Sequence, residues 1–313
     1  MKKTSIFFIG IVTMLYSCLE PFNPTVTETE NSYLVFEGIM LNVLNESHIR
    51  LSYSQSLNSN IKTQVEANAI VSVETEPYNI IVFNPIGNGI YSAGIVPWNN
   101  YSRCKLKIEI PNRIYESDFC QIKEAPEIDS ITWKADDEGL HILVNAHDVN
   151  NDTWYYRYEY IETAEYHSYA QSYLMWDFES DSVVTRLKDD QIFFCWSTFS
   201  SKDIMLATSK NLSKDLLIDQ EVVTIPPESW KHSWKYSILL KQYALTKEAY
   251  DYLYNIEKSN EEIGSLFDPQ PVNVNGNIHC ISNPDDKVIG FFTVGSYTEK
   301  RKFINSFQLP KIG

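Results

Sequence analysis

Apolar and polar residues alternate along much of this chain with the period of two that half-buried β-strands show. Between residues 33 and 124 no stretch of useful length has helical periodicity. Strands are predicted instead at residues 33–36, 48–53, 69–74, 80–83 and 104–110, separated by turns rich in Asn, Gly, Pro and Ser. Residues 33–125 are therefore expected to form an N-terminal domain with a β-sandwich-like fold.

The segment 124–127 has the composition of a linker, and a second set of strands follows it. These strands are predicted at residues 128–133, 140–146, 154–162, 191–197, 236–243, near His279 and at 288–294. One helix is expected at residues 246–262, because Thr246 can cap its N-terminus and apolar residues recur on one face. The fold class is thus mainly β, with two β-sandwich-like domains, and residues 126–313 form the C-terminal β-rich domain that carries the helix.

The first eighteen residues have the pattern of an export signal. Two lysines precede an apolar run at residues 6–16, which is shorter than the roughly 20 residues of a membrane span. The run ends in Leu15-Tyr16-Ser17-Cys18, which resembles the lipobox of bacterial lipoproteins. Residues 1–17 are therefore predicted to be a lipoprotein signal peptide, and Cys18 the lipid-modified N-terminus. An ordinary signal peptide with an incidental Cys18 is the alternative.

Acylation would anchor the chain to a membrane without a transmembrane segment. Two or three acyl chains, palmitate among them, suffice for stable anchoring, since each buried methylene contributes about 0.8 kcal/mol. Residues 18–32 contain prolines and glutamates and little to bury, so they are expected to form an acylated tether. The formal charge of −15 becomes −17 without the two signal-peptide lysines. Such a surface repels nucleic acid and anionic lipid, so no nucleic-acid partner is expected.

Several motifs of the chain resemble those of a known family. They are Leu-Val-Phe-Glu-Gly at 34–38, Pro-Glu-Ile-Asp-Ser at 126–130, and the segments 236–245, 249–250, 264–271, 276–280, 283–284 and 299–301. With the lipobox, they resemble DUF4249, a domain-of-unknown-function family of Bacteroidetes lipoproteins. The resemblance covers nearly the whole chain and implies a place at the outer membrane. Family genes often lie near genes for TonB-dependent outer-membrane receptors, which implies such a receptor as a partner. The family supplies no catalytic residue.

Four cysteines of the mature chain are candidates for disulfides in an exported protein. The family resemblance favours Cys195 with Cys280, because members often carry the motifs around both. For Cys104 and Cys120 the sequence leaves two alternatives open. A hairpin centred on Asn112 places them opposite each other, whereas a two-residue turn formed by Asn112 and the next residue places them on opposite faces.

The sequence contains other possible metal-binding and catalytic residues, but each group has a simpler structural explanation. Residues 148–152 have the oxygen spacing of a calcium loop but lack its glycine and a well-placed distal glutamate, so a hairpin turn is the better interpretation. His141 and His147 would share one strand face without a visible third metal ligand. The acidic residues 136–138 fit a solvated turn, and no Gly-x-Ser-x-Gly or Cys-x-x-Cys motif is present. No metal, cofactor or catalytic residue is therefore predicted.

Aromatic residues of the second domain form the most suggestive cluster. Trp154, Tyr156, Tyr158 and Tyr160 are the candidate partner-binding residues, and the cluster also includes Tyr155, Tyr166, Tyr169, Tyr173 and Trp176. Core and cross-strand packing is the competing interpretation. The chain is therefore expected to be a lipid-anchored envelope protein at the outer membrane that binds or assembles with a receptor, without catalysis. An envelope glycan hydrolase and a structural adhesion module are the alternatives.

Overall fold

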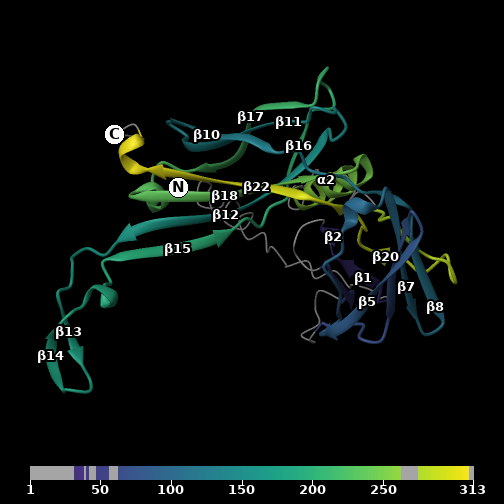
Figure 1. The fold of residues 1–313 in the computed structure, drawn as a ribbon, viewed down its shortest axis with the longest axis horizontal. Helices are drawn as coiled ribbons and strands as arrows, with labels where there is room; N and C mark the ends of the chain where they lie inside the picture. The colour runs from purple at the N-terminus through teal and green to yellow at the C-terminus, as the bar shows by residue number, and fades with distance from the viewer. Residues whose placement is uncertain (1–31, 39, 42–46, 56–62, 262–273, 310–313) are drawn as a thin grey trace, which may run out of the picture.

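The computed structural model describes residues 32–38, 40–41, 47–55, 63–261 and 274–309. These residues are mainly β-strand, as the sequence predicted, and they form two lobes with a slender hairpin that extends away from them (Figure 1). The hairpin and the N-terminal lobe lie on the same side of the second lobe, so the molecule has the outline of an arch.

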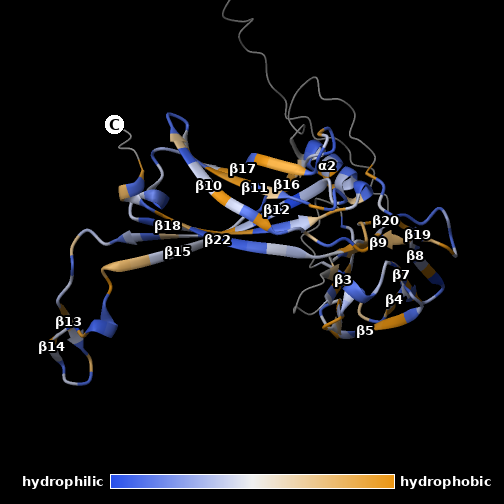
Figure 2. Cartoon of the chain, turned by 45° about the horizontal axis from the view of Figure 1, so that its top comes forward, coloured by the Kyte–Doolittle hydropathy of each residue, from blue (hydrophilic) through white to orange (hydrophobic). Residues whose placement is uncertain are grey.

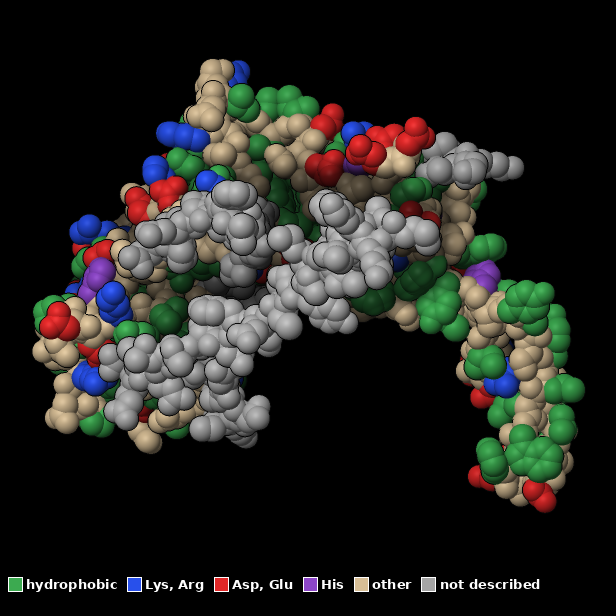
Figure 3. Space-filling view, turned by 180° about the vertical axis from the view of Figure 1, so that it is seen from behind, with side chains coloured by type: hydrophobic (Ala, Val, Ile, Leu, Met, Phe, Trp, Pro, Cys, Tyr) green, Lys and Arg blue, Asp and Glu red, His purple; other side chains and the backbone are tan. Residues whose placement is uncertain are grey.

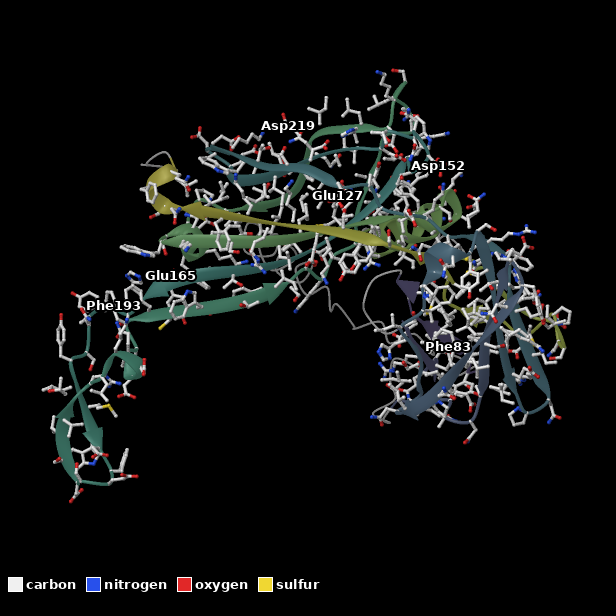
Figure 4. All side chains as sticks on the ribbon, viewed as in Figure 1. Phe83, Glu127, Asp152, Glu165, Phe193 and Asp219 are labelled. Atoms are coloured by element: carbon white, nitrogen blue, oxygen red, sulfur yellow. The ribbon has the colours of Figure 1, made fainter. Side chains whose placement is uncertain are left out.

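The N-terminal lobe is a curved sheet of mostly antiparallel strands. They are β1 (Leu34–Glu37), β3 (Ser47–Tyr53), β4 (Ile70–Glu76), β5 (Asn79–Gly87), β6 (Ile90–Gly94), β7 (Arg103–Ile110), β8 (Arg113–Ser117) and β9 (Cys120–Gln121). The short strand β2 (Met40–Leu41) belongs to a separate two-stranded sheet in this lobe. Alternate residues such as Ile49, Leu51 and Phe83 are almost fully buried, and Figure 4 shows Phe83 within this lobe. Burial of every second side chain is the physical basis of the alternating sequence pattern.

Three short strands from the C-terminal part of the chain complete this lobe. β19 (Ile278–Cys280) pairs antiparallel with β8, while β20 (Val288–Ile289) and β21 (Val294–Gly295) pair parallel with β1 and β2. β19 and β20 stand at the two ends of the strand order and lie close to each other, so the sheet is nearly closed into a barrel. The sequence assigned these residues to the segment 126–313, and the structure packs Ile278, Phe292 and Val294 into the first core.

The hairpin between β7 and β8 determines how Cys104 and Cys120 lie. Asn112, with a left-handed φ of 64°, is the second residue of a two-residue turn, so Ile110 pairs with Arg113. The pairing shifts by one residue between β8 and β9, and Cys104 then lies directly opposite Cys120. The two cysteines therefore lie opposite each other. Neither of the two predicted hairpin registers included the one-residue shift that produces this arrangement.

The second lobe is a sandwich of two sheets. The first sheet contains β10 (Ile128–Asp136), β11 (Gly139–His147) and β17 (Leu216–Ile225). The second has the order β15 (Phe194–Ser200), β12 (Tyr155–His167), β18 (Lys235–Ala244) and β22 (Tyr297–Asn305), with β16 (Met205–Thr208) pairing the start of β12. Ile142, Ile238 and Leu240 are among the side chains that fill the space between the two sheets.

One α-helix, α2 (Lys247–Glu261), lies among the described residues and confirms the predicted helix. The Thr246 hydroxyl accepts a hydrogen bond from the backbone N–H of Ala249 at 3.2 Å, which caps the first turn. Ala249 is buried, and the ring of Tyr250 packs on Tyr155 of β12 with centroids 5.1 Å apart. No helix in the described ranges is long and apolar enough to cross a membrane.

The segment that joins the lobes is held by hydrogen bonds from the C-terminal part of the chain. The backbone N–H of Ser296 donates to the carbonyl oxygen of Lys123, and the Ser296 hydroxyl accepts from the N–H of Ala125 at 2.7 Å. The carbonyl oxygen of Pro126 accepts hydrogen bonds from the side chains of Gln242 and Thr298, both at 2.8 Å. The connection between the lobes is therefore an ordered part of the fold.

Candidate functional site

The hairpin that joins β12 to β15 extends away from both lobes (Figure 1). We call residues 168–193 the arm; it contains β13 (Leu174–Asp177), β14 (Ser182–Thr185) and the 3-10 turn η2 (Lys188–Asp190). Among the described residues, β13 and β14 pair only with each other. An isolated two-stranded hairpin is at best marginally stable in water. The arm therefore needs further support, from its own polar contacts or from a partner.

Local hydrogen bonds give the arm its shape. At the tip, the Asp177 carboxylate accepts hydrogen bonds from the backbone N–H groups of Glu179 and Ser180, at 3.2 and 3.3 Å, and from the Ser180 hydroxyl at 2.6 Å. These bonds, that from the Ser180 side chain foremost, hold the pKa of Asp177 below its usual range, so the tip stays negative. Nearer the body, the Arg186 guanidinium donates to the carbonyl oxygen of Asp190 at 2.7 Å.

The apolar side chains of the arm are uncovered. Phe178 at the tip is 89% exposed and Trp176 is 47% exposed. The other strongly exposed apolar residues of the arm are Tyr169, Tyr173, Leu174, Val183, Leu187 and Ile192. Figure 2 shows hydrophobic residues interspersed with hydrophilic ones along the arm, and Figure 3 shows them over its length. Soluble monomers rarely expose large continuous apolar patches, and such patches mark interaction surfaces.

The arm is also acidic. It carries five carboxylates and two basic side chains, and Figure 3 shows acidic side chains at its tip. A surface that is both apolar and negative is repelled by anionic lipid headgroups. It suits a protein partner that offers apolar contacts and positive charge.

An aromatic cluster fixes the arm to the body. The ring centroid of His167, the last residue of β12, lies 4.0 Å from that of Trp234, 4.6 Å from Phe193 and 4.7 Å from Phe194. The backbone N–H of Ser168 donates to the carbonyl oxygen of Phe193 at 3.0 Å, which joins the two ends of the arm. Figure 4 shows Phe193 where the arm leaves the second lobe. These contacts set the direction of the arm at its base.

The apolar surface continues from the arm onto the body. Trp196 of β15 is 60% exposed, and with the half-exposed Phe303 it borders a shallow hollow of about 170 Å³. Thr163, Glu165, Lys235, Ser237 and Arg301 complete the lining of this hollow. Figure 4 shows Glu165 on β12, close to the base of the arm. The arm and this hollow together form the candidate functional site.

Two of the candidate partner-binding tyrosines belong to the core of the second lobe. Tyr156 and Tyr158 are buried between the two sheets, where their hydroxyls donate to Asp215 at 2.8 Å and to Gln242 at 2.9 Å. Burial raises the pKa of both tyrosines. Core packing, the competing interpretation, therefore describes these two residues, because side chains inside the sandwich cannot contact a partner.

Trp154 and Tyr160 are partly buried and have structural neighbours. Trp154 has a left-handed φ of 58°. Its backbone N–H donates a hydrogen bond to the Asp215 carboxylate at 2.8 Å, and the Lys210 ammonium lies over its ring. The side chain of Tyr160 packs against the second core. Of the wider aromatic cluster, Tyr169, Tyr173 and Trp176 are the members that the structure exposes on the arm.

All four described cysteines are free thiols. Cys195 lies on β15, where its Sγ is 3.6 Å from the carbonyl oxygen of Ile192, and Cys280 lies on β19 in the other lobe. The structure therefore does not bring together the pair that the family resemblance favoured. Cys104 and Cys120 are buried, with their Sγ atoms 3.6 Å apart. Cys18, the predicted lipid-attachment residue, lies outside the described residues.

The residues that suggested metal binding are engaged in hydrogen bonds. Asp148 accepts them from the backbone N–H groups of Asn150, Asp152 and Thr153, which makes residues 148–153 a turn. Burial raises the pKa of Asp148, but these bonds outweigh it and lower the pKa.

His141 belongs to a second polar group on the first sheet of the second lobe. Three atoms of the kind that can bind a metal lie within 4.8 Å of one another here: a carboxylate oxygen each from Asp136 and Glu138 and a ring nitrogen of His141. The ring of His141 is already bonded through Nε2 to Asp136 at 2.8 Å and through Nδ1 to Glu221 at 3.0 Å. This group therefore has the geometry of an imidazolium held between two carboxylates.

Sequence reasoning named three exposed aromatics of the arm but missed Phe178, Leu174 and Leu187. A signal was present: residues 168–190 are rich in Ser and Asp yet carry several aromatic residues. Loops of that length are uncommon in compact domains unless they are functional or disordered.

These features define a two-lobed, mainly β protein with an exposed aromatic arm. The chain belongs to the family described as domain of unknown function DUF4249, whose sequence profile matches residues 19–301. The match confirms the predicted membership of this domain-of-unknown-function family. No curated protein matches the chain.

Proposed function

We propose that this protein is a lipid-anchored protein of the cell envelope that binds a receptor of the TonB-dependent type at the outer membrane, without catalysis. The arm is its contact element. The observation that carries the proposal is the exposure of eight apolar side chains on one thin hairpin. Tyr and Trp, which are prominent among them, dominate the binding energy of protein interfaces.

The exposed arm is large enough for a specific interface. Its eight apolar side chains offer on the order of 1,000 Å² of surface, since each aromatic ring alone can bury about 150–250 Å². One partner in a standard protein–protein interface buries about 800 Å². The arm can therefore supply most of one side of such an interface, and the neighbouring hollow around Trp196 extends it.

The predicted lipid anchor would make even a weak contact productive. The proposed tether at residues 18–32 precedes β1 in the sequence, so it would connect the lipid anchor to the N-terminal lobe. Fifteen extended residues reach about 50 Å at most. Confinement to a membrane plane raises the effective concentration of an embedded partner, so a modest affinity gives high occupancy.

The hollow is the feature that a glycan-hydrolase function would use. Its two aromatic residues could stack on a sugar ring, but Glu165 is the one carboxylate among the described residues that line it. Glycosidases generally use two carboxyl groups, roughly 5–9.5 Å apart, across the scissile bond. Partner binding therefore explains more of the candidate site than glycan hydrolysis does.

Affinity purification from crosslinked cells tests the proposal. The native anchored protein is compared with a triple arm variant, Tyr173→Ser, Trp176→Ser and Phe178→Ser, and with the control Phe307→Ser. Phe307 is 84% exposed on the body, so the control removes a similar ring from another surface. We expect a receptor to co-purify with wild type and control and to be depleted about tenfold or more with the arm variant.

Two outcomes would contradict the proposal. Undiminished receptor recovery with the arm variant would show that the arm is not the contact. Hydrolysis of envelope glycans by the purified protein, with no co-purifying receptor, would favour the enzymatic alternative.

A further inference from the structure

We propose that Cys104 and Cys120 form an intrachain disulfide after export, which links β7 covalently to β9. The cysteines lie directly opposite each other on these antiparallel strands, and their Sγ atoms are already in contact at 3.6 Å. The expectation that they are oxidised in cells rests on the envelope location proposed above. The pairing itself rests only on the geometry.

The backbone geometry suits this bond without rearrangement. Directly opposed residues of antiparallel strands have Cα atoms about 4.5–5.5 Å apart. Disulfides span Cα separations of about 4.4–6.8 Å. To form the bond, the two Sγ atoms must approach to about 2.05 Å, which side-chain rotation can provide. The one-residue shift between β8 and β9 creates the opposition, since the register of β7 with β8 alone would not align the two cysteines.

The two sulfurs have slightly different environments in the folded lobe. Cys104 is fully buried and Cys120 is 8% exposed. The contact with Cys120, together with burial, raises the pKa of Cys104, while the same contact lowers the pKa of Cys120. These shifts belong to the folded lobe, where the two sulfurs are in contact. Because both side chains are covered in the finished lobe, oxidation has to occur while β9 is still joining the sheet.

The reaction is a thiol–disulfide exchange with an oxidising disulfide of the envelope, on a thiol oxidase or a small molecule. The Cys120 thiolate attacks one sulfur of the oxidant, so a mixed disulfide forms and a thiolate leaves. The Cys104 thiolate then attacks Cys120 Sγ and displaces the second thiolate. The two cysteines lose two protons and two electrons, and the oxidant disulfide is reduced to two thiols.

The bond would strengthen the route between the anchored lobe and the arm. β9 leads within two residues to Lys123, whose carbonyl oxygen accepts the N–H of Ser296 at the junction of the lobes. A covalent link from β9 to β7 therefore ties this junction to the N-terminal core. Among the described residues, neither Cys195 nor Cys280 lies opposite another cysteine, and their Sγ atoms contact the carbonyl oxygen of Ile192 and the hydroxyl of Ser282.

Peptide mapping of the full protein tests the pairing. Cells are quenched with acid, and the protein purified from whole cells is denatured, alkylated without reduction, digested and analysed by mass spectrometry. We expect one peptide pair joined through Cys104 and Cys120, which reduction separates, and alkylated Cys195 and Cys280. Alkylation of both Cys104 and Cys120, or a link between Cys195 and Cys280, would overturn the proposal.

A parallel experiment separates geometry from location. The mature chain is refolded with oxidised glutathione and mapped in the same way, beside the double variant Cys195→Ser, Cys280→Ser, which should keep the link. A link after refolding but free thiols in cells would overturn the envelope location. Free thiols in both samples would overturn the pairing itself. Reduction of the linked protein should lower its unfolding midpoint by on the order of 5 °C.

Discussion

Side chains that the sequence pattern cannot distinguish have opposite roles in the second lobe. Tyr156 is buried, and its hydroxyl donates a hydrogen bond to the buried Asp215 carboxylate. The same carboxylate accepts a hydrogen bond from the backbone N–H of Trp154. Tyr169, from the same aromatic cluster, is fully exposed. Both belong to tyrosine-rich stretches, so local sequence did not separate them. Burial depends on the partner strand, which lies far away in the chain.

Removal of the Tyr156 hydroxyl should destabilise the protein. In Tyr156→Phe the buried Asp215 carboxylate loses one donor, which costs about 1–3 kcal/mol of unfolding free energy. Tyr169→Phe should leave stability unchanged, because its hydroxyl is in solvent. Denaturant unfolding of the two variants measures the difference, and equal stabilities would show that the Asp215 network contributes little.

His141 should make stability depend on pH. The hydrogen bond to Asp136 is the largest cause that raises the pKa of His141 above 6.5, and Glu221 adds to it. The folded state therefore binds this proton more tightly than the unfolded chain does. The extra stability is fully present below pH 6.5 and is lost as pH rises through the raised pKa.

Thermal unfolding between mildly acidic and mildly alkaline pH measures this effect. The unfolding midpoint should fall with rising pH in the wild type, and the fall should be smaller in His141→Gln. His147→Gln is the matched control, because His147 forms an exposed pair with Asp129. A wild-type midpoint that is flat across this range would contradict the assignment.

At the scale of elements, long strands and the helix were predictable, and short or irregular strands were not. β12 and β18 are thirteen and ten residues long, and α2 has both a cap and an apolar face. β17 was missed because its pairing with β11 shifts around Asp219, which has a left-handed φ of 48° and is labelled in Figure 4. Such a bulge interrupts the period of two on which prediction depends.

The arm should be dispensable for folding. Replacement of residues 169–192 by a short Gly-Ser turn removes exposed side chains and leaves the aromatic cluster around His167 in place. We expect the unfolding midpoint to change by less than about 2 °C, because surface changes typically alter stability by no more than about 0.5 kcal/mol. Binding of a hydrophobic dye should fall. A loss of many degrees would show that the arm supports the second lobe instead.

At the scale of the whole molecule, sequence patterns did not predict that a C-terminal segment of the chain pairs with strands of the N-terminal lobe. β19, β20 and β21 contain two or three residues each, too few to show a period. Their place is set by close backbone approach. Gly290 has φ 137°, and a Cβ there would lie 2.4 Å from the carbonyl oxygen of Phe36.

Gly290→Ala should therefore loosen the N-terminal lobe. Both the backbone conformation and the contact with Phe36 oppose a side chain, so we expect a cost on the order of 3 kcal/mol. Gly94→Ala is the control, because its φ is 67° but no atom lies within 4 Å of the added Cβ. That variant should lose about 1–2 kcal/mol from strain alone. Equal losses in denaturant unfolding would argue against the close approach.

The central claim, that the arm contacts a membrane-embedded partner, is tested most directly by photo-crosslinking in cells. A photoreactive phenylalanine replaces Phe178 at the arm tip or, as a control, Phe307 on the body; both positions are more than four-fifths exposed. We predict that light gives one major adduct, with an outer-membrane receptor, from position 178 and not from position 307. No adduct from position 178, or the same adducts from both positions, would contradict the claim.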